Sequence, residues 1–281
     1  MKILSNKKEL EIYIKESKSH NKKIGFAPTM GALHAGHISL YKLARKDNDV
    51  VISSIFVNPT QFNNAQDLEK YPRTIEADIQ KLTESQLVDA VYIPSVEDVY
   101  PNGLKSQSYD FDGLENEMEG KFRPGHFEGV GTIVEELFAQ VQPDNAYFGE
   151  KDFQQLAIIR KMVEKKNIPT KIHGAEILRE PHGLAMSSRN ERLNNTDREH
   201  AKIIYETLLK VKNWFGEKSI PEIKQEVENI FKTAENFELE YFIIADEQTL
   251  KETDLPIENH KYRAFIAVFV GEVRLIDNIG L

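Results

Sequence analysis

Two histidines in one short stretch are the first residues of the chain that could do chemistry. His34 and His37 stand in "PTMGALHAGHISL", residues 28–40, directly after the apolar stretch "KIGFA". Their spacing predicts two imidazoles one turn apart on one helix face, at the end where the helix dipole is positive. Gly36 between them allows a phosphate to approach the backbone closely. We therefore predict that this strand-to-helix junction binds an anion.

This stretch could also be a nucleotide loop, a zinc site or a simple helix cap. Gly31 and Gly36 have the spacing of a Walker A loop, yet His37 and Ile38 occupy the positions where that loop has Lys and Ser or Thr. Zinc helices of proteases use a four-residue step between histidines and a Glu, and the stretch has neither. The plainest alternative is a pair of polar side chains that cap or flank a helix start, and the stretch alone leaves it open.

Two more polar clusters follow apolar segments further along the chain. In "FGEKD", Lys151 and Asp152 stand side by side at the end of one such segment. Each cluster alone is typical of a solvated surface, but three clusters at or shortly after predicted strand ends favour a common functional site. The cluster in "AMSSRN" contributes Ser187, Ser188 and Arg189.

The segments that must position these clusters alternate between strand and helix patterns over the first two thirds of the chain. Short apolar runs rich in β-branched or aromatic residues predict buried strands, and segments with helical spacing separate them. This alternation is typical of a Rossmann-like, doubly wound parallel sheet, an α/β fold that binds ligands at the carboxyl ends of its strands. We assign it to a first domain, residues 1–185. The predicted strands are 23–27, 50–57, 88–94, 145–149 and 171–178.

The remainder of the chain, residues 186–281, has a different pattern. Amphipathic helices are predicted near 197–215 and 220–235. Three strands follow, "FELEYFIIAD", "YRAFIAVFV" and "VRLIDNI", close enough in sequence to pair as an antiparallel sheet. We predict a smaller C-terminal α+β domain that covers the active site.

Composition limits the function classes. The 281 residues carry a net charge of -9 and no cysteine, which excludes disulfides and thiolate metal sites. The acidic balance argues against a nucleic-acid partner but leaves small anionic ligands open. The N-terminal "MKILSNKKEL" has no apolar signal region and no apolar run is long enough for a membrane span, so we expect a cytoplasmic protein without a membrane partner.

The motifs also resemble those of a known family. "HAGH" is similar to the HIGH motif, and "MSSR" to the KMSKS-like loop, of the superfamily that joins class I aminoacyl-tRNA synthetases to small nucleotidyltransferases. The chain as a whole resembles the pantothenate synthetase (pantoate–β-alanine ligase) family, although Phe153 stands where the family often has Tyr. The motifs that carry this resemblance are "PTMGALHAGH", "SIFVNPTQF", "YPRT", "RPGHFEGV", "FGEKDFQQL", "GLAMSSRN" and "RLIDNI".

The resemblance implies a two-step reaction that uses ATP and magnesium. Pantoate attacks the α-phosphorus to give pantoyl adenylate and pyrophosphate, and the amine of β-alanine then displaces AMP to give pantothenate. A homodimer is also implied. Two alternatives stay open: another HIGH-motif nucleotidyltransferase, acting for instance on nicotinate mononucleotide or pantetheine phosphate, or a nucleotide-binding module without activity.

The resemblance assigns roles to individual residues. His37 is the proton donor or charge stabiliser, and Asp152 is a candidate magnesium ligand. Gln61 and Gln155 bind pantoate, with Gln61 also near β-alanine. The apolar wall facing pantoate consists of Pro28, Met30, Phe56 and Val130. The catalytic phosphate donors are His34, His37, Lys151, Ser187, Ser188 and Arg189. The ATP site consists of Met30, Gly31, Ala32, Leu33, His34, Ala35, Gly36, His37, Gly149, Glu150, Lys151, Asp152, Leu178, Met186, Ser187, Ser188 and Arg189.

Overall fold

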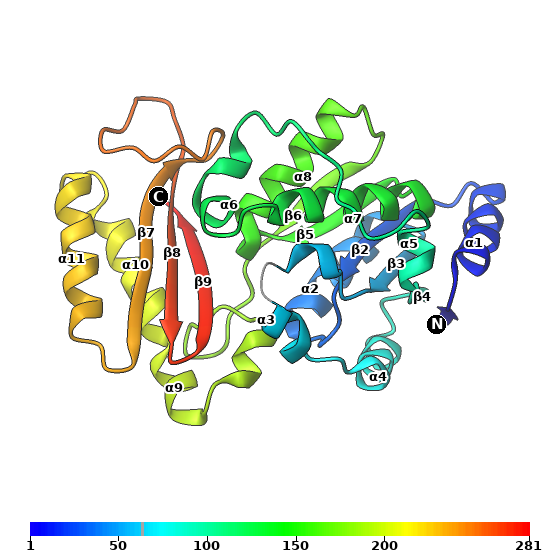
Figure 1. The fold of residues 1–281 in the computed structure, drawn as a ribbon, viewed down its shortest axis with the longest axis horizontal. Coiled ribbons are helices and arrows are strands. Elements are labelled where there is room, and N and C mark those ends of the chain that lie inside the picture. Colours follow the sequence, from blue (N-terminus) through cyan, green and yellow to red (C-terminus); the bar gives the residue numbers. More distant parts are fainter. Residues whose placement is uncertain (63–64) are drawn as a thin grey trace. The chain divides into compact units, whose positions relative to one another are not determined.

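The computed structural model describes residues 1–62 and 65–281, which fold into two compact units (Figure 1). The first unit comprises residues 1–150 and 154–176, and the second comprises residues 151–153 and 177–281. The predicted domain boundary after residue 185 falls inside the second unit. The reason is that Arg179 pairs with Ala185 in an antiparallel bridge and donates two hydrogen bonds to Asp277, at 2.6 and 3.0 Å.

A parallel sheet of six strands forms the centre of the first unit. Its order is β1-β4-β3-β2-β5-β6, so the direction of winding reverses between β2 and β5. Ligands in such sheets bind beyond the carboxyl ends of the strands at this reversal. The strands are β1 Lys2–Leu4, β2 Ile24–Thr29, β3 Val50–Ile55, β4 Ala90–Tyr92, β5 Asn145–Gly149 and β6 Lys171–Ala175.

Side chains alternate between the two faces of this sheet, and each face is covered. On β2, Phe26 packs edge-on against Phe138, whereas the next residue, Ala27, lies in a cluster with Leu40 and Leu82. Successive residues of a strand point to opposite faces, so both faces are buried, as the predicted doubly wound α/β fold requires. The fold class is therefore confirmed. The helices of this unit are α1 Lys7–Ser19, α2 Ala35–Asp47, α3 Ala65–Lys70, α4 Ile75–Ser85, α5 Val96–Val99, α6 Met118–Phe122, α7 His126–Val141 and α8 Phe153–Lys165, with short 3-10 turns η1 Pro59–Gln61 and η2 Leu114–Asn116. Turn η3 Glu150–Asp152 and the first residue of α8 contain residues 151–153, which are assigned to the second unit.

The second unit is built on three antiparallel strands in the order β7-β8-β9, as predicted. The helix expected near 197–215 is two helices, because the chain turns at Ala201, where the N–H of Ile204 bonds three residues back to the Ala201 carbonyl. The elements are η4 Ser188–Arg192, α9 Asn195–His200, α10 Lys202–Trp214, α11 Ile220–Lys232, β7 Phe237–Asp246, β8 Tyr262–Val270 and β9 Val273–Gly280.

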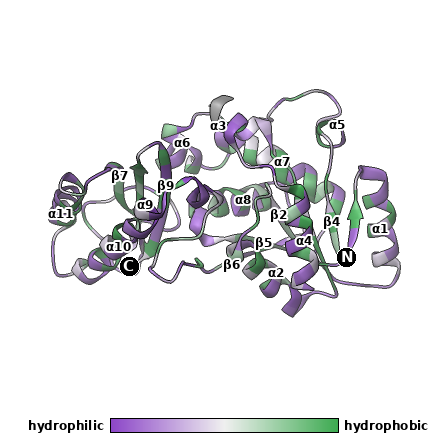
Figure 2. Cartoon of the chain, turned by 90° about the horizontal axis from the view of Figure 1, so that it is seen from below, coloured by the Kyte–Doolittle hydropathy of each residue, from purple (hydrophilic) through white to green (hydrophobic). Residues whose placement is uncertain are grey.

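Individual helices carry both hydrophobic and hydrophilic residues (Figure 2). In α11, Ile220, Ile223, Val227 and Phe231 are buried at helical spacing, and most of the other positions carry polar residues. Within the described part of the chain, no helix combines the length and the apolar character needed to cross a membrane.

Candidate active site

The two histidines form the start of helix α2. His34 is the N-cap, and its Nδ1 accepts a hydrogen bond from the backbone N–H of Gly36 at 3.1 Å. His37 is the third residue of the helix, and its Nδ1 accepts from the backbone N–H of His34 at 3.2 Å. This is a reciprocal capping box, here made by two imidazoles whose ring centres lie 4.1 Å apart. The alternative that the two histidines cap the helix start is thus confirmed. The prediction placed both imidazoles on the helix, but His34 is the N-cap and only His37 lies within α2.

The capping box has a chemical consequence. A backbone N–H can only donate, so the Nδ1 atom of each ring must accept and cannot carry the proton of a neutral imidazole. The proton of each neutral ring therefore resides on Nε2. The same geometry that caps α2 thus provides two Nε2–H donors at the positive end of a helix, which is the arrangement a phosphate needs.

Gln61 is held by a buried network that the sequence did not predict. Gln61 is 9% exposed, and its Oε1 accepts a hydrogen bond from Nδ2 of Asn58 at 3.0 Å. Asn58 is fully buried, and its Oδ1 accepts from the hydroxyls of Tyr100 and Thr60. Because Asn58 occupies the carbonyl end of the Gln61 amide, Nε2 is the end of Gln61 left for a ligand.

Helix α7 approaches this network unusually closely. A Cβ atom built on Gly129 would lie 2.4 Å from the carbonyl oxygen of Thr60, so only glycine fits there. The carbonyl of Gly129 accepts a hydrogen bond from Asn58 Nδ2 at 3.2 Å, and Nδ1 of His126 bonds the Gln61 carbonyl at 2.9 Å. Asn58 lies in the motif "NPTQF", and His126 and Gly129 lie in "RPGHFEGV". The sequence therefore marked these residues as parts of motifs, but it did not show that the two motifs contact each other.

The adjacent glutamines of α8 have different environments. Gln154 is buried, donates to the carbonyls of Leu114 and Glu117, and accepts from the N–H of Glu119. Gln155 is half-buried, and its side chain makes no hydrogen bond to the residues that the structure describes. Gln154 therefore holds a loop in place, whereas the amide of Gln155 is available to a ligand.

The four residues of the predicted apolar wall differ in exposure. Val130 is 1% exposed and Phe56 is 8% exposed, so both also belong to the packed interior of the first unit. Pro28 lies on β2, and Met30 directly follows this strand; both are partly exposed. Packing alone explains the burial of Val130, while Pro28 and Met30 keep surface that a small apolar group could cover.

Lys151 and Asp152 belong to turn η3, directly after β5. The Lys151 Nζ lies 3.5 Å from Asp152 Oδ1, and the Lys151 carbonyl accepts from Asn278 Nδ2 at 2.9 Å. Among the described residues no group of three or more carboxylates and histidines could hold a metal ion. Magnesium is often bound by one or two carboxylates together with substrate phosphates and water, and Asp152 fits as such a carboxylate.

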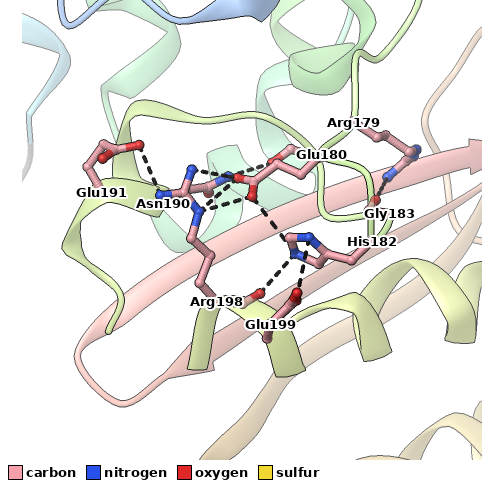
Figure 3. Close-up of polar contacts among 9 residues, drawn as sticks. Arg179, Glu180, His182, Gly183, Asn190, Glu191, Arg198 and Glu199 are labelled. Atoms are coloured by element: carbon pink, nitrogen blue, oxygen red, sulfur yellow. Dashed lines mark hydrogen bonds and ion pairs between the residues drawn. The ribbon is translucent and has the colours of Figure 1, made fainter. Parts of the chain in front are cut away.

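The serine and arginine cluster of the second unit lies on a tightly anchored loop. Figure 3 shows the contacts of the anchoring residues Glu180, Asn190 and Arg198. Ser187 caps turn η4, with its Oγ accepting from the N–H of Arg189 at 3.2 Å. Asn190, which is 1% exposed, donates to the Ala185 carbonyl and to Oε1 of Glu180. The N–H of Met186 bonds the carbonyl of Leu178, which brings these two predicted ATP contacts together.

Glu180 is the charged centre of this anchor. Arg198 donates to both of its carboxylate oxygens, at 3.0 and 3.1 Å, as Figure 3 shows. Burial by itself raises the pKa of Glu180, but the hydrogen bonds from Arg198 and Asn190 and the charge of Arg198 outweigh it and lower the pKa from its ordinary 4.5. Glu180 therefore remains ionised at neutral pH and ties the loop to helix α9.

The predicted site residues divide between the two units. The first unit contains the histidine turn, both glutamines and the apolar wall, together with Gly149 at the end of β5 and Glu150 at the start of η3. The second unit contains Lys151, Asp152, Leu178 and the segment 186–189. Hydrogen bonds within the first unit hold the histidine turn and Gln61, and hydrogen bonds within the second unit hold Met186 and Ser187.

Comparison with known proteins identifies the family. A family model described as pantoate-beta-alanine ligase matches residues 2–280. The pantothenate synthetase of Flavobacterium psychrophilum is 55% identical over 281 residues, 100% of both chains. The crystal structure of pantothenate synthetase from Thermus thermophilus has a TM-score of 0.90 at 38% identity and covers 99% of each chain. The pantoate-beta-alanine ligase of Francisella tularensis, solved in complex with beta-gamma ATP and beta-alanine, has a TM-score of 0.82 at 41% identity and covers 100% of this chain and 97% of its own.

These matches extend over the whole length of the chain and include both units. They agree with the resemblance found in the motifs, and they do not support the two alternatives, a nucleotidyltransferase with another acceptor or a module without activity. The chain belongs to the pantoate-beta-alanine ligase family and is an enzyme, a ligase that joins pantoate to β-alanine.

Proposed function

We propose that the enzyme works through pantoyl adenylate. The pantoate carboxylate attacks the α-phosphorus of ATP and expels pyrophosphate, and the amine of β-alanine then attacks the activated carbonyl and expels AMP. The observation that carries this proposal is the capping box, which supplies two Nε2–H donors at a helix start. Charge that builds on phosphate oxygens in the transition state is stabilised most by donors already in place.

The phosphate donors are the six residues that the resemblance assigns. In the first step His34 and His37 donate from Nε2 to phosphate oxygens, and His37 stabilises the charge that develops on them. Lys151, which keeps 18% of its side chain exposed, adds a positive charge, and Ser187, Ser188 and Arg189 add hydroxyl and guanidinium donors. The ATP contacts are those that the sequence predicts, from Met30 to His37, from Gly149 to Asp152, at Leu178, and from Met186 to Arg189.

Pantoate binds to the two glutamines. Gln61 donates from Nε2, since Asn58 occupies its Oε1, and Gln155 offers an amide without a partner among the described residues. Amides can bond the hydroxyl and carboxylate of pantoate without adding a buried charge. Pro28, Met30, Phe56 and Val130 face its apolar part, and Gln61 also lies near β-alanine.

Magnesium is proposed as the companion of ATP, with Asp152 as its protein ligand. When bound, the ion would neutralise phosphate charge. The 3.5 Å separation of Lys151 Nζ and Asp152 Oδ1 supports a shared role of these two residues near the phosphates. A homodimer and a cytoplasmic location are proposed from the sequence alone.

A product assay tests the function. The purified chain, incubated with ATP, magnesium, pantoate and β-alanine, should form pantothenate and AMP in equal amounts, measured by mass spectrometry. Without β-alanine, labelled pyrophosphate should exchange into ATP only when pantoate is present. Formation of ADP in place of AMP, or pantothenate formation without any pyrophosphate exchange, would contradict the adenylate route.

A further inference from the structure

The turn before helix α2 has a backbone conformation that alanine rarely adopts. Gly31 has φ of 83° and Ala32 has φ of 51°, so two consecutive residues lie in the left-handed region. Glycine adopts this region freely, whereas the Cβ of alanine makes it unfavourable. Some other part of the molecule must therefore hold Ala32 in place, and the turn leads directly into the His34 cap.

Helix α4 supplies this support through Asp78. The Asp78 carboxylate is fully buried; its Oδ2 accepts from the backbone N–H of Ala32 at 2.9 Å and its Oδ1 from the N–H of Leu33 at 2.7 Å. The hydroxyl of Thr74 donates to Oδ2 at 3.1 Å. A buried carboxylate needs such donors, and hydrogen bonds to an ionised acceptor are stronger than neutral ones.

A second side chain of α4, that of Lys81, bonds the carbonyl of Leu33. Its Nζ donates to this carbonyl at 2.6 Å. Asp78 and Lys81 are three residues apart on α4, so they lie on one helix face. Together they bond both backbone groups of Leu33, the residue immediately before the His34 cap.

We propose that Asp78 is a positioning residue for the adenylation step. It holds the left-handed turn at Gly31 and Ala32 so that His34 and His37 form the capping box and present Nε2 to the phosphates. Asp78 is buried, so it acts through the turn rather than by touching substrate. This inference rests on the proposed role of the two histidines, and its test includes a measurement that does not depend on activity.

The main variant is Asp78→Asn, which keeps the shape but replaces one acceptor oxygen by an NH2 group that faces a backbone N–H. We expect the rate of pantoate-dependent pyrophosphate exchange to fall about 10- to 100-fold, because a small misplacement of reacting groups costs that much. The KM for pantoate should change less than about twofold, since the glutamines lie on other elements. Glu76→Gln, the same change at an exposed position of α4, is the matched control and should leave the rate unchanged.

A rescue experiment separates positioning from general stability. Ala32→Gly removes the Cβ that makes the left-handed turn unfavourable. Added to Asp78→Asn, it should therefore raise the pyrophosphate exchange rate at least about threefold above that of Asp78→Asn alone. If Asp78 only stabilised the fold, Ala32→Gly would raise the unfolding midpoint without restoring the rate. That result would overturn the proposal.

The histidine rings provide the readout that is independent of activity. Long-range ¹H–¹⁵N NMR spectra should show Nε2-protonated rings for His34 and His37 in the wild type and mixed tautomers in Asp78→Asn. Unchanged spectra together with an unchanged rate would overturn the inference. Changed spectra in a chain whose wild type makes no pantothenate would support Asp78 as the holder of the turn and refute the proposed function instead. Should Asp78→Asn fail to fold, Lys81→Met removes the other hold on Leu33 from an exposed residue, and it must shift the same spectra for the proposal to stand.

Discussion

Nδ1 of His37 accepts the backbone N–H of His34 at 3.2 Å, so the two histidines cap one helix together. Capping uses Nδ1 of each ring and the proposed phosphate binding uses Nε2, so a substitution can separate the two roles. Asparagine is a favourable N-cap residue and keeps an acceptor where Nδ1 of His34 stands, but it has no donor at the position of Nε2.

His34→Asn is therefore predicted to keep the stability of the fold and lose activity. The pyrophosphate exchange rate should fall about 100-fold or more, the usual effect of removing one donor already in place. His34→Ala should lose the same activity and, in addition, about 1 kcal/mol of unfolding free energy, because the cap is gone. Urea unfolding of both variants checks the difference. Normal exchange in His34→Asn would limit His34 to its capping role.

Substitutions of the two neighbouring glutamines of α8 should have different effects, one on the KM for pantoate and the other on stability. Gln155→Ala should raise the KM for pantoate far more than the KM for ATP. It should leave the unfolding midpoint almost unchanged, since the Gln155 side chain makes no hydrogen bond to the described residues. Gln154→Ala should lower the unfolding free energy by about 1 to 3 kcal/mol, because three backbone groups lose their buried partner. Steady-state kinetics with each substrate varied in turn, together with thermal unfolding, distinguish the two. An equal effect of Gln155→Ala on both KM values would mean that the pantoate site is wrongly placed.

Gly129→Ala tests the close approach of α7 to the Gln61 network. The added methyl group would lie 2.4 Å from the Thr60 carbonyl, so the helix or the turn must move, at a cost of about 1 to 3 kcal/mol in unfolding free energy. The movement should also separate Asn58 from Gly129 and raise the KM for pantoate. Gly125→Ala provides a comparison, because no atom lies within 4 Å of its Cβ position, although its φ of 79° adds some strain. A Gly129→Ala protein with wild-type stability and KM would show that the network does not depend on this contact.

Glu180 predicts a pH dependence of stability. Its pKa in the folded chain is below the ordinary 4.5, so its contribution is fully present above pH 4.5 and is lost as the pH falls through the lowered value. Glu180→Gln should be less stable than the wild type by about 1 to 2 kcal/mol at pH 7, with Arg198 partly exposed to solvent. This difference should shrink as the pH falls below 4.5 and through the lowered pKa of Glu180, where the wild-type carboxylate becomes protonated.

Urea unfolding at a series of pH values measures this effect. Glu191→Gln is a suitable control, because Glu191 also pairs with Arg198, at 3.2 Å, but keeps 73% of its side chain exposed. It should leave the pH profile nearly unchanged. A constant difference between the wild type and Glu180→Gln from pH 7 to pH 3 would contradict the assignment of the lowered pKa to Glu180.

The sequence by itself determined the fold class and the family. Runs rich in apolar residues, five or more residues long, predicted every strand of the two sheets except β1. Strand β4 also has only three residues but lies within the predicted run 88–94, whereas "KIL" of β1 is not part of such a run. The motifs that carry the resemblance lie in single short segments, so they can be recognised without knowing what each residue contacts. His34, His37, Gln61 and Gln155 were all proposed as site residues in this way.

The tertiary structure alone decided how these residues are held. Asn58 meets Gly129 across 71 residues of sequence, and Asp78 meets Ala32 across 46. Periodicity and turn signals are local, whereas these contacts depend on which strands and helices become neighbours when the chain folds. The same reason explains the place of residues 151–153 in the second unit. Residue types can therefore indicate which chemistry is available, but which nitrogen of each histidine can donate to a ligand is fixed only by its hydrogen-bond partners in the folded chain.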